Sequence, residues 1–449
     1  MRYLAALAFP SFLFAQAPPK AVDARVAKMV AAVSTARVEA SMRKLESFGT
    51  RGNYTDPTWK DQGIGAARRW ILQEFKSYSP KLDVRFDTYR VKKQQRIFRD
   101  VEIVNVVATL RGTRYPDHQI VISGHYDSLN LMRRGNQERA ENAIPPVLSD
   151  EEQSKRANAP APGVSDDASG VAATLELARV LSQYEFDKTL VFIAFAGEEI
   201  GLLGSTLHAQ KAKSESQIID AVLNSDIIGT EVSDDGRRDN RTVRVFSADP
   251  ADSPSRHLAR YIHDAGRRYF PKFETQLVFR ADRVGRGGDH TPFANEGFAA
   301  VRFTSAVENL AQQHSEADTV ANASPQYTAD VTRLKAAVAA SLASAPKAPV
   351  TARGLSRGRS GYGATLRWKD EETAPDLAGY AVVYRSTLSP SWQHEVFAGK
   401  KTELTLPNVD IDNLVFGVKA IDADGNESLV SSFSGRASAY STPRKIETY

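Results

Sequence analysis

The strongest constraint on the fold is an apolar run that ends at two carboxylates. Residues 190–195 read LVFIAF, and an unbroken apolar run of this length is typical of a central strand buried on both faces of a sheet. Ala196 and Gly197 let the chain turn before Glu198 and Glu199. Ligands of open α/β sheets bind at the carboxyl ends of the strands. Because neighbouring carboxylates repel each other, we expect a cation to compensate these glutamates; the alternative is a solvated acidic loop.

Strand-like and helix-like segments alternate along the first three quarters of the chain. Segments of strand type lie at 82–91, 103–110, 119–124, 190–195, 221–223, 243–246, 275–279 and 299–303, and segments with helical spacing lie at 21–48, 64–78, 171–181, 253–269 and 325–343. This alternation predicts an α/β fold, a three-layer sandwich whose central sheet is mixed, mainly parallel and covered by helices. The polar segment 129–162 is predicted to be a long loop, and such loops are usually functional or mobile.

The N-terminus indicates where the protein is sent, and the composition limits which residue types could bind a metal. Residues 1–17 read MRYLAALAFPSFLFAQA, which predicts a signal peptide and an exported protein, periplasmic or secreted. No other run is long enough to cross a bilayer. There is no cysteine, so a metal site must be built from His, Asp and Glu. The 58 basic and 54 acidic residues give a formal net charge of +4, which does not favour a nucleic-acid partner.

The composition changes at residue 344. Residues 18–343 are predicted to form the large α/β domain, 344–349 a linker, and 350–449 a small β-sandwich of short strands separated by turns. The β-sandwich resembles a fibronectin type III module in four ordered patterns: Leu366-Arg-Trp368, Tyr380-x-Val-x-Tyr384, Leu404-x-Leu-Pro407 and Phe416-x-Val-x-Ala420. The resemblance implies a module that attaches the chain to glycans or proteins, acts as a spacer, or stabilises the larger domain.

Polar side chains stand at the ends of several predicted strands or head a helix. They are His125, Asp127, Asp166, Glu198, Glu199, Asp226 and, in a late loop, His314. Singly, each has an ordinary explanation as a turn residue, a helix cap or a surface group. Together they supply two imidazoles and three carboxylates as ligands, with a spare carboxylate, which is the inventory of a two-metal hydrolytic site.

Zinc chemistry accounts for these parts. Zinc binds imidazole nitrogen and carboxylate oxygen, a zinc pair requires a bridging carboxylate, and bound zinc lowers the pKa of its water to about 7. Asp127 lies two residues past His125, on the same side of an extended segment, where it can hold the imidazole. Glu198 adjoins a ligand without being one, so it can take the proton from the water and pass it to the leaving amine.

Five ordered blocks resemble the secreted co-catalytic di-zinc aminopeptidases. The blocks are His125-x-Asp127-Ser, Asp166-Asp-Ala-Ser-Gly170, Glu198-Glu-x-Gly-Leu-x-Gly-Ser205, Asp226 and His314. The same family includes glutamate carboxypeptidases, plasma carboxypeptidases and glutaminyl cyclases, and the match covers roughly residues 40–343. By position, the resemblance implies His125 and Asp226 on one zinc, Glu199 and His314 on the other, Asp166 bridging, Glu198 as general base and Asp127 behind His125. The block Gly287-Gly-Asp289-His290-x-x-Phe293 also matches, but Asp289 and His290 are not assigned to metal.

The resulting expectation is an exported exopeptidase with two Zn²⁺ ions per chain. It would hydrolyse the N-terminal peptide bond of peptides by a metal-bound hydroxide, with Glu198 as general base. One alternative is a carboxypeptidase, for which Arg280, Arg283 and Arg286 could bind the substrate carboxylate. A glutaminyl cyclase would use one zinc. The remaining alternative is a non-catalytic binding protein attached through its β-sandwich.

Overall fold

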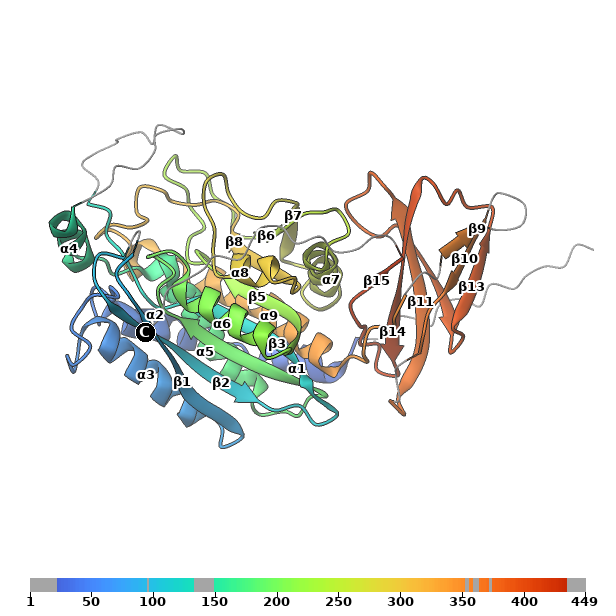
Figure 1. The fold of residues 1–449 in the computed structure, drawn as a ribbon, viewed down its shortest axis with the longest axis horizontal. Coiled ribbons are helices and arrows are strands. Elements are labelled where there is room, and N and C mark those ends of the chain that lie inside the picture. Colours follow the sequence, from blue (N-terminus) through green and yellow to red (C-terminus); the bar gives the residue numbers. More distant parts are fainter. Residues whose placement is uncertain are drawn as a thin grey trace, which may run out of the picture. The chain divides into compact units, whose positions relative to one another are not determined.

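The computed structural model describes residues 22–94, 97–132, 149–351, 355–357, 363–370 and 374–433. The predicted signal peptide and residues 133–148 of the predicted loop lie outside these ranges. The described residues fall into two compact units, 22–345 and 346–433 (Figure 1).

The larger unit is built on one mixed sheet of eight strands, β1-β2-β4-β3-β5-β8-β6-β7 in spatial order. The strands are β1 Leu82–Val91, β2 Val101–Leu110, β3 Tyr115–His125, β4 Lys188–Phe195, β5 Ile218–Ser225, β6 Thr242–Ser247, β7 Glu274–Val278 and β8 Ala300–Ser305. Four neighbouring pairs are parallel, β3 with β4, β3 with β5, β5 with β8 and β6 with β7. The other three pairs are antiparallel.

Strand β4 is the buried centre that the apolar run predicts. Every residue of β4 is buried, and the strand pairs with β2 on one side and β3 on the other. A strand in this position has helices over both of its faces, so neither set of its side chains meets water.

Helices cover both faces of this sheet. They are α3 Gly63–Tyr78, α5 Ser169–Leu181, α6 Leu203–Ser214, α7 Pro254–Tyr269, α8 His290–Asn295 and α9 Pro325–Ser344. Two further helices pack mainly on these helices: α1 Ala24–Ala31 on α9, and α2 Thr35–Glu46 on α5 and α9. Helices α5 and α9 both contact β3 and β4. Helix α6 packs on β2, helix α8 packs on β5 and β8, and α6 and α8 also contact each other. Ser253 and Ser324 cap α7 and α9 just before a proline, a sequence pattern that starts helices. The α/β prediction is confirmed.

The predicted loop 129–162 is corrected in part. Residues Asp150–Asn158 form helix α4. Ser149 accepts a hydrogen bond from the backbone N–H of Glu152, and the Glu152 side chain accepts one from the backbone N–H of Ser149. This capping box explains how a very polar segment starts a helix.

The smaller unit is all β, as predicted. One antiparallel sheet has the order β13-β10-β9 and the other β12-β11-β14-β15. The strands are β9 Leu355–Arg357, β10 Gly363–Arg367, β11 Leu377–Ser386, β12 His394–Gly399, β13 Glu403–Pro407, β14 Leu414–Asp422 and β15 Ser431–Ser432. Trp368, Tyr380 and Phe416 lie in its apolar core. Assignment as a fibronectin type III module stays a prediction. Among the described residues, no helix has the length and apolarity needed to span a membrane.

Candidate metal centre

Three parallel strands deliver side chains to one edge of the sheet. His125 is the last residue of β3, Glu198 and Glu199 follow β4 after a turn, and Asp226 follows β5. Because β3 lies between β4 and β5 and is parallel to both, the three carboxyl ends meet at the same edge. At the turn, Gly197 has a φ of 76°, a left-handed conformation that glycine adopts without strain.

Two neighbouring loops complete the cluster. Asp166 belongs to the short segment η1, Val164–Ala168, which precedes α5. His314 lies in the loop between β8 and the short 3₁₀ helix η2, Val320–Asn322, ahead of α9. The structure therefore brings all five predicted ligands and the predicted base together.

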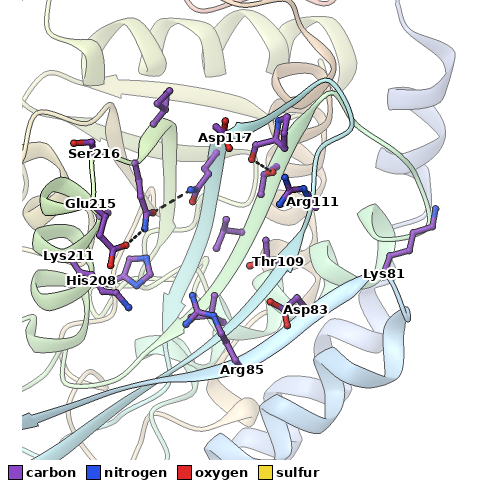
Figure 2. A pocket seen from close by; sticks show the side chains of 18 residues that line it. Lys81, Asp83, Arg85, Thr109, Arg111, Asp117, His208, Lys211, Glu215 and Ser216 are labelled. Carbon is purple, nitrogen blue, oxygen red and sulfur yellow. Dashed lines mark hydrogen bonds between the residues drawn. The ribbon is translucent and has the colours of Figure 1, made fainter.

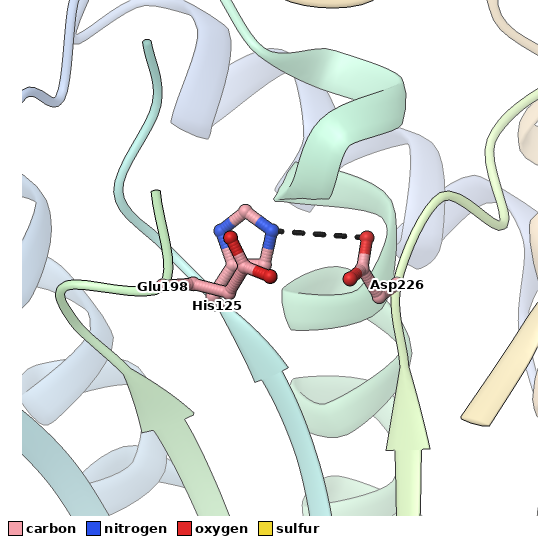
Figure 3. A group of neighbouring side chains, drawn as sticks. All are labelled: His125, Glu198 and Asp226. Carbon is pink, nitrogen blue, oxygen red and sulfur yellow. Dashed lines mark ion pairs between the residues drawn. The ribbon is translucent and has the colours of Figure 1, made fainter. Parts of the chain in front are cut away.

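The donor atoms form two groups, and within each group they lie within 4.8 Å of one another. One group is His125, Glu198 and Asp226 (Figure 3), and the other is Asp166, Glu199 and His314. Glu198 thus lies close enough to donate an oxygen to a cation as well as to act as a base.

The Asp166 carboxylate lies between the two histidines. Its Oδ1 is 3.1 Å from Nε2 of His125, and its Oδ2 is 3.0 Å from Nε2 of His314. Nε2 of His125 is also 3.8 Å from Oδ1 of Asp226, and Nε2 of His314 is 3.2 Å from Oε2 of Glu199. One oxygen facing each group is the arrangement that a bridging carboxylate requires.

The donor set fits a divalent cation such as zinc. Imidazole nitrogen and carboxylate oxygen are donors that zinc takes in proteins. Oε1 of Glu199 is buried and, within the described part of the chain, has no hydrogen-bond partner. Burying such an oxygen is unfavourable unless a hydrogen-bond donor or a cation compensates it.

Residues 105–339 match the sequence model of peptidase family M28. The chain belongs to this family. It is 33% identical over 443 residues to a probable zinc metalloprotease of Phaeosphaeria nodorum, and the alignment covers 90% of this chain and 87% of that relative.

Two solved structures share the fold of the M28 chain. The LapA aminopeptidase of Legionella pneumophila has a TM-score of 0.51 and 19% identity, covering 71% of this chain and 74% of that one. A glutaminyl cyclase of Macrostomum lignano has a TM-score of 0.52 and 16% identity, covering 73% of this chain and 95% of that one. These similarities concern the fold, since an aminopeptidase and a cyclase both match it.

In the M28 site, Asp127 does more than the sequence predicts. Nδ1 of His125 is 3.6 Å from Oδ1 of Asp127 and 3.1 Å from its carbonyl oxygen. The Asp127 carboxylate also accepts hydrogen bonds from the backbone N–H groups of Glu198 and Glu199, at 3.3 and 3.2 Å, and from Asn53 at 2.7 Å. Asp127 therefore joins the loop after β3 to the loop after β4.

The adjacent aspartates have different surroundings. Asp166 faces the histidines, whereas the Asp167 carboxylate accepts hydrogen bonds from the backbone N–H groups of His125 and Gly170, at 3.1 and 2.9 Å. A third, from Ile227, is 3.3 Å long. Asp167 thus fixes the backbone of the site, while Asp166 is placed to bind a ligand.

Anionic charge raises the pKa of both histidines. Burial opposes protonation of His125, but the nearby carboxylates of Asp127, Asp166 and Asp226 outweigh burial and raise its pKa well above the ordinary value. In the same way, Glu199 and Asp166 outweigh burial and raise the pKa of His314 to about 10. The site therefore attracts positive charge strongly.

The acidic groups separate into two classes. Burial raises the pKa of Glu198 well above its ordinary value, and repulsion from Asp226 and Glu199 adds to the rise. Burial also acts against ionisation of Asp166, but His314 and His125 outweigh it and hold its pKa well below the ordinary value. Asp166 therefore suits a permanently ionised ligand. Burial also raises the pKa of Glu199, so the position of Glu198 beside the donor groups, and not the direction of its pKa shift, marks it as the base.

Two fully buried arginines support the site without having been predicted. Arg302, in β8, lies 3.0 Å from Oδ1 of Asp226 and 3.0 Å from Oδ2 of Asp282. Arg51 donates hydrogen bonds to the carbonyl oxygens of Tyr126 and Gly163, at 2.7 and 2.8 Å, and so links the segments that carry His125 and Asp166. Arg302 could have been noticed in the sequence, because it is a charged residue inside the strand-like stretch AVRFTS. The sequence around Arg51 contains no comparable indication of burial.

A cavity of about 380 Å³ opens over the donor cluster. Its wall is formed by Asp166, Glu198, Glu199, Gly201, Leu202, Asp226, Arg283, Gly285, Arg286, Gly287 and His314. Arg280, the third arginine of the predicted carboxylate-binding set, is exposed and does not line this cavity.

A larger cavity, of about 660 Å³, contains none of the predicted ligands. Figure 2 shows its lining, in which His208 and Lys211 of α6 and Glu215 just after it lie near Arg85 of β1 and Thr109 of β2. Its mixture of charges offers no convergent set of catalytic groups.

Proposed function

We propose that this chain is an exported exopeptidase that holds two zinc ions and hydrolyses the N-terminal peptide bond of peptides. The observation that carries the proposal is the Asp166 carboxylate, whose two oxygens lie 3.1 and 3.0 Å from two different histidines. A shared carboxylate between two donor groups suits a pair of cations.

Each ion would have two ligands of its own and share Asp166. His125 and Asp226 would hold one ion, and Glu199 and His314 the other. When bound, zinc supplies Lewis-acid chemistry, because it polarises a carbonyl oxygen and makes a nearby water more acidic.

The chain's own residues would handle the proton. The Glu198 carboxyl lines the cavity beside the donor groups, where it can accept the proton of the attacking water and then donate it to the leaving amine. Asp127 holds the backbone of Glu198 and Glu199, so it acts as a positioning residue for both.

The cavity favours cleavage at a chain end. A volume of about 380 Å³ is at the lower end of the range for small-molecule sites, which suits one or two residues of a peptide. The fold neighbour LapA is an aminopeptidase, and this agrees with action at the N-terminus. A carboxypeptidase is the second candidate, and it is favoured by Arg283 and Arg286 in the cavity wall.

The remaining parts of the chain are assigned from sequence. Residues 1–17 would direct export to the periplasm or the medium. The smaller unit would be a fibronectin type III-like module that attaches the enzyme to glycans or proteins.

The deciding experiment compares activity with zinc content. We expect the purified chain to cleave aminoacyl anilides and not N-blocked dipeptides; the reverse result would assign a carboxypeptidase. Glu198→Gln should lower kcat by about 10²–10⁴-fold and retain zinc, whereas the exposed-site control Glu185→Gln should change neither. Full activity in Glu198→Gln would exclude Glu198 as the base, and loss of zinc would make it a ligand instead.

A further inference from the structure

One wall of the cavity over the donor cluster is cationic. Arg283 and Arg286 line this wall, and their side chains are 12% and 17% exposed. Acidic residues at the carboxyl ends of the strands line the same cavity. A substrate in this cavity would therefore meet both metal-binding groups and guanidinium groups.

The wall carries more positive than negative charge. The buried Glu308 carboxylate is shared by three arginines: it pairs with Arg244, lies 2.6 Å from Nη1 of Arg283, and lies 4.0 Å from Nη1 of Arg286. Asp282, the other carboxylate near Arg283, is shared with Arg302. Arg302 also pairs with Asp226. Three carboxylates, Glu308, Asp282 and Asp226, thus face four guanidinium groups, which leaves one positive charge in excess.

Arg286 has donors to spare. Among the described residues, its side-chain hydrogen bonds involve Nη1 alone, which donates to Oε1 of Gln313 at 3.1 Å. A guanidinium has five N–H donors in a planar fork. The remaining donors suit a carboxylate, which guanidinium groups bind through two parallel hydrogen bonds.

The arginine wall is fixed relative to the donor cluster. Arg302 donates a hydrogen bond to the carbonyl oxygen of Gly287 at 2.8 Å and also pairs with Asp226. A Cβ atom at Gly288 would lie 3.2 Å from Oδ2 of Asp226, so the backbone packs directly against that residue. Groups held in this way lose little freedom when they bind a ligand.

We propose that Arg283 and Arg286 bind a carboxylate of the substrate, carried by one of the two residues that flank the cleaved peptide bond. This inference rests on the proposed function and adds the substrate class. The carboxylate is either the C-terminal carboxylate of a dipeptide or the side chain of an acidic residue. Both have the same charge and geometry, and the donors of the two arginines suit either.

Three matched pairs of substrates test the proposal. Leu-Gly carries a C-terminal carboxylate that Leu-Gly-amide lacks. Leu-Asp-amide carries a side-chain carboxylate on its second residue, where Leu-Asn-amide has an amide. Glu-anilide carries a side-chain carboxylate on its first residue, where Gln-anilide has an amide. In at least one pair, we expect the carboxylate to raise kcat/KM by about tenfold or more, since hydrogen bonds to charged groups contribute about 1.5–3 kcal/mol. The pair that shows the preference identifies the source of the carboxylate.

Variants locate the effect. In Arg286→Gln, the ratio of kcat/KM between the two substrates of that pair should fall close to 1. Arg286→Lys keeps the positive charge but loses the planar set of N–H donors, so its ratio should be intermediate. Arg280→Gln is the matched control, because Arg280 lies on the same loop and is exposed, and it should keep the full preference. Equal rates within all three wild-type pairs, or a preference that survives in Arg286→Gln, would overturn the proposal. If no substrate is hydrolysed, the proposed function fails and this inference fails with it.

Discussion

Nε2 of His314 lies 3.0 Å from Oδ2 of Asp166. The same two loops meet again at Asp318, whose carboxylate accepts hydrogen bonds from the backbone N–H groups of Ser165 and Asp166, at 2.7 and 3.0 Å. The position of the shared carboxylate is therefore set by the loop that supplies one of the histidines.

Asp318→Asn should weaken metal binding. The two N–H groups donate to different oxygens of Asp318. Asparagine keeps the size of the side chain but replaces one of these oxygens with an NH2 group, which cannot accept a hydrogen bond. Loss of groups that orient metal ligands typically costs about 10–100-fold in affinity. Zinc dissociation constants from chelator competition would measure this loss. Asp330→Asn on α9 is the control, and an unchanged affinity in Asp318→Asn would contradict the role given to this residue.

Arg302→Met should destabilise the larger unit. The substitution leaves Asp226 and Asp282 as buried carboxylates without their guanidinium partner. Breaking a buried ion pair in this way costs about 3–5 kcal/mol. Urea denaturation should record that loss, and Arg302→Met combined with Asp282→Asn should recover part of it because one unpaired charge is removed. A loss below about 1 kcal/mol in the single variant would show that Arg302 is not the counter-charge.

The sequence predicts the ligands better than it predicts their support. His125, Glu199 and Asp226 are recognisable because each is a polar residue at the end of an apolar strand, and parallel strand ends converge. The alternation of segments likewise predicts the layers of the fold. In the sequence, the family resemblance alone selects Asp166 over Asp167. The physical difference between them is which backbone N–H groups lie nearby, and the residue pattern by itself does not contain that information.

The features that the sequence did not predict are mainly buried charged side chains and one helix defined by its cap. Arg302 and Lys335 lie within a strand and a helix, and their partners come from other elements, Asp226 and Ser225 of the strand-end region. An analysis of hydrophobic periodicity places charged residues such as these on the exposed face of a strand or helix. Helix α4 was missed because its composition is polar throughout, although the Ser149 and Glu152 capping box was a usable signal.

Lys335 predicts a pH dependence of stability. Its Nζ is buried 2.5 Å from Oγ of Ser225, and burial lowers its pKa from 10.5 to about 7. Between these two values the unfolded chain binds more protons than the folded chain. Stability should therefore rise as pH increases from 7 to 10.5, by up to about 5 kcal/mol from this group.

Lys335→Met is the matching variant. It should be more stable than the wild type at pH 7, and the difference should shrink as pH approaches 10.5. Denaturation midpoints of both proteins across this pH range measure the effect. A difference that does not vary with pH would mean that Lys335 keeps its ordinary pKa in the folded protein.

Anomalous diffraction at the zinc edge from crystals of the purified chain tests most directly whether five side chains hold two zinc ions with Asp166 between them. We predict two peaks per chain, both beside Asp166. One should also lie beside His125 and Asp226, and the other beside Glu199 and His314. A single peak, or peaks away from these side chains, would contradict it.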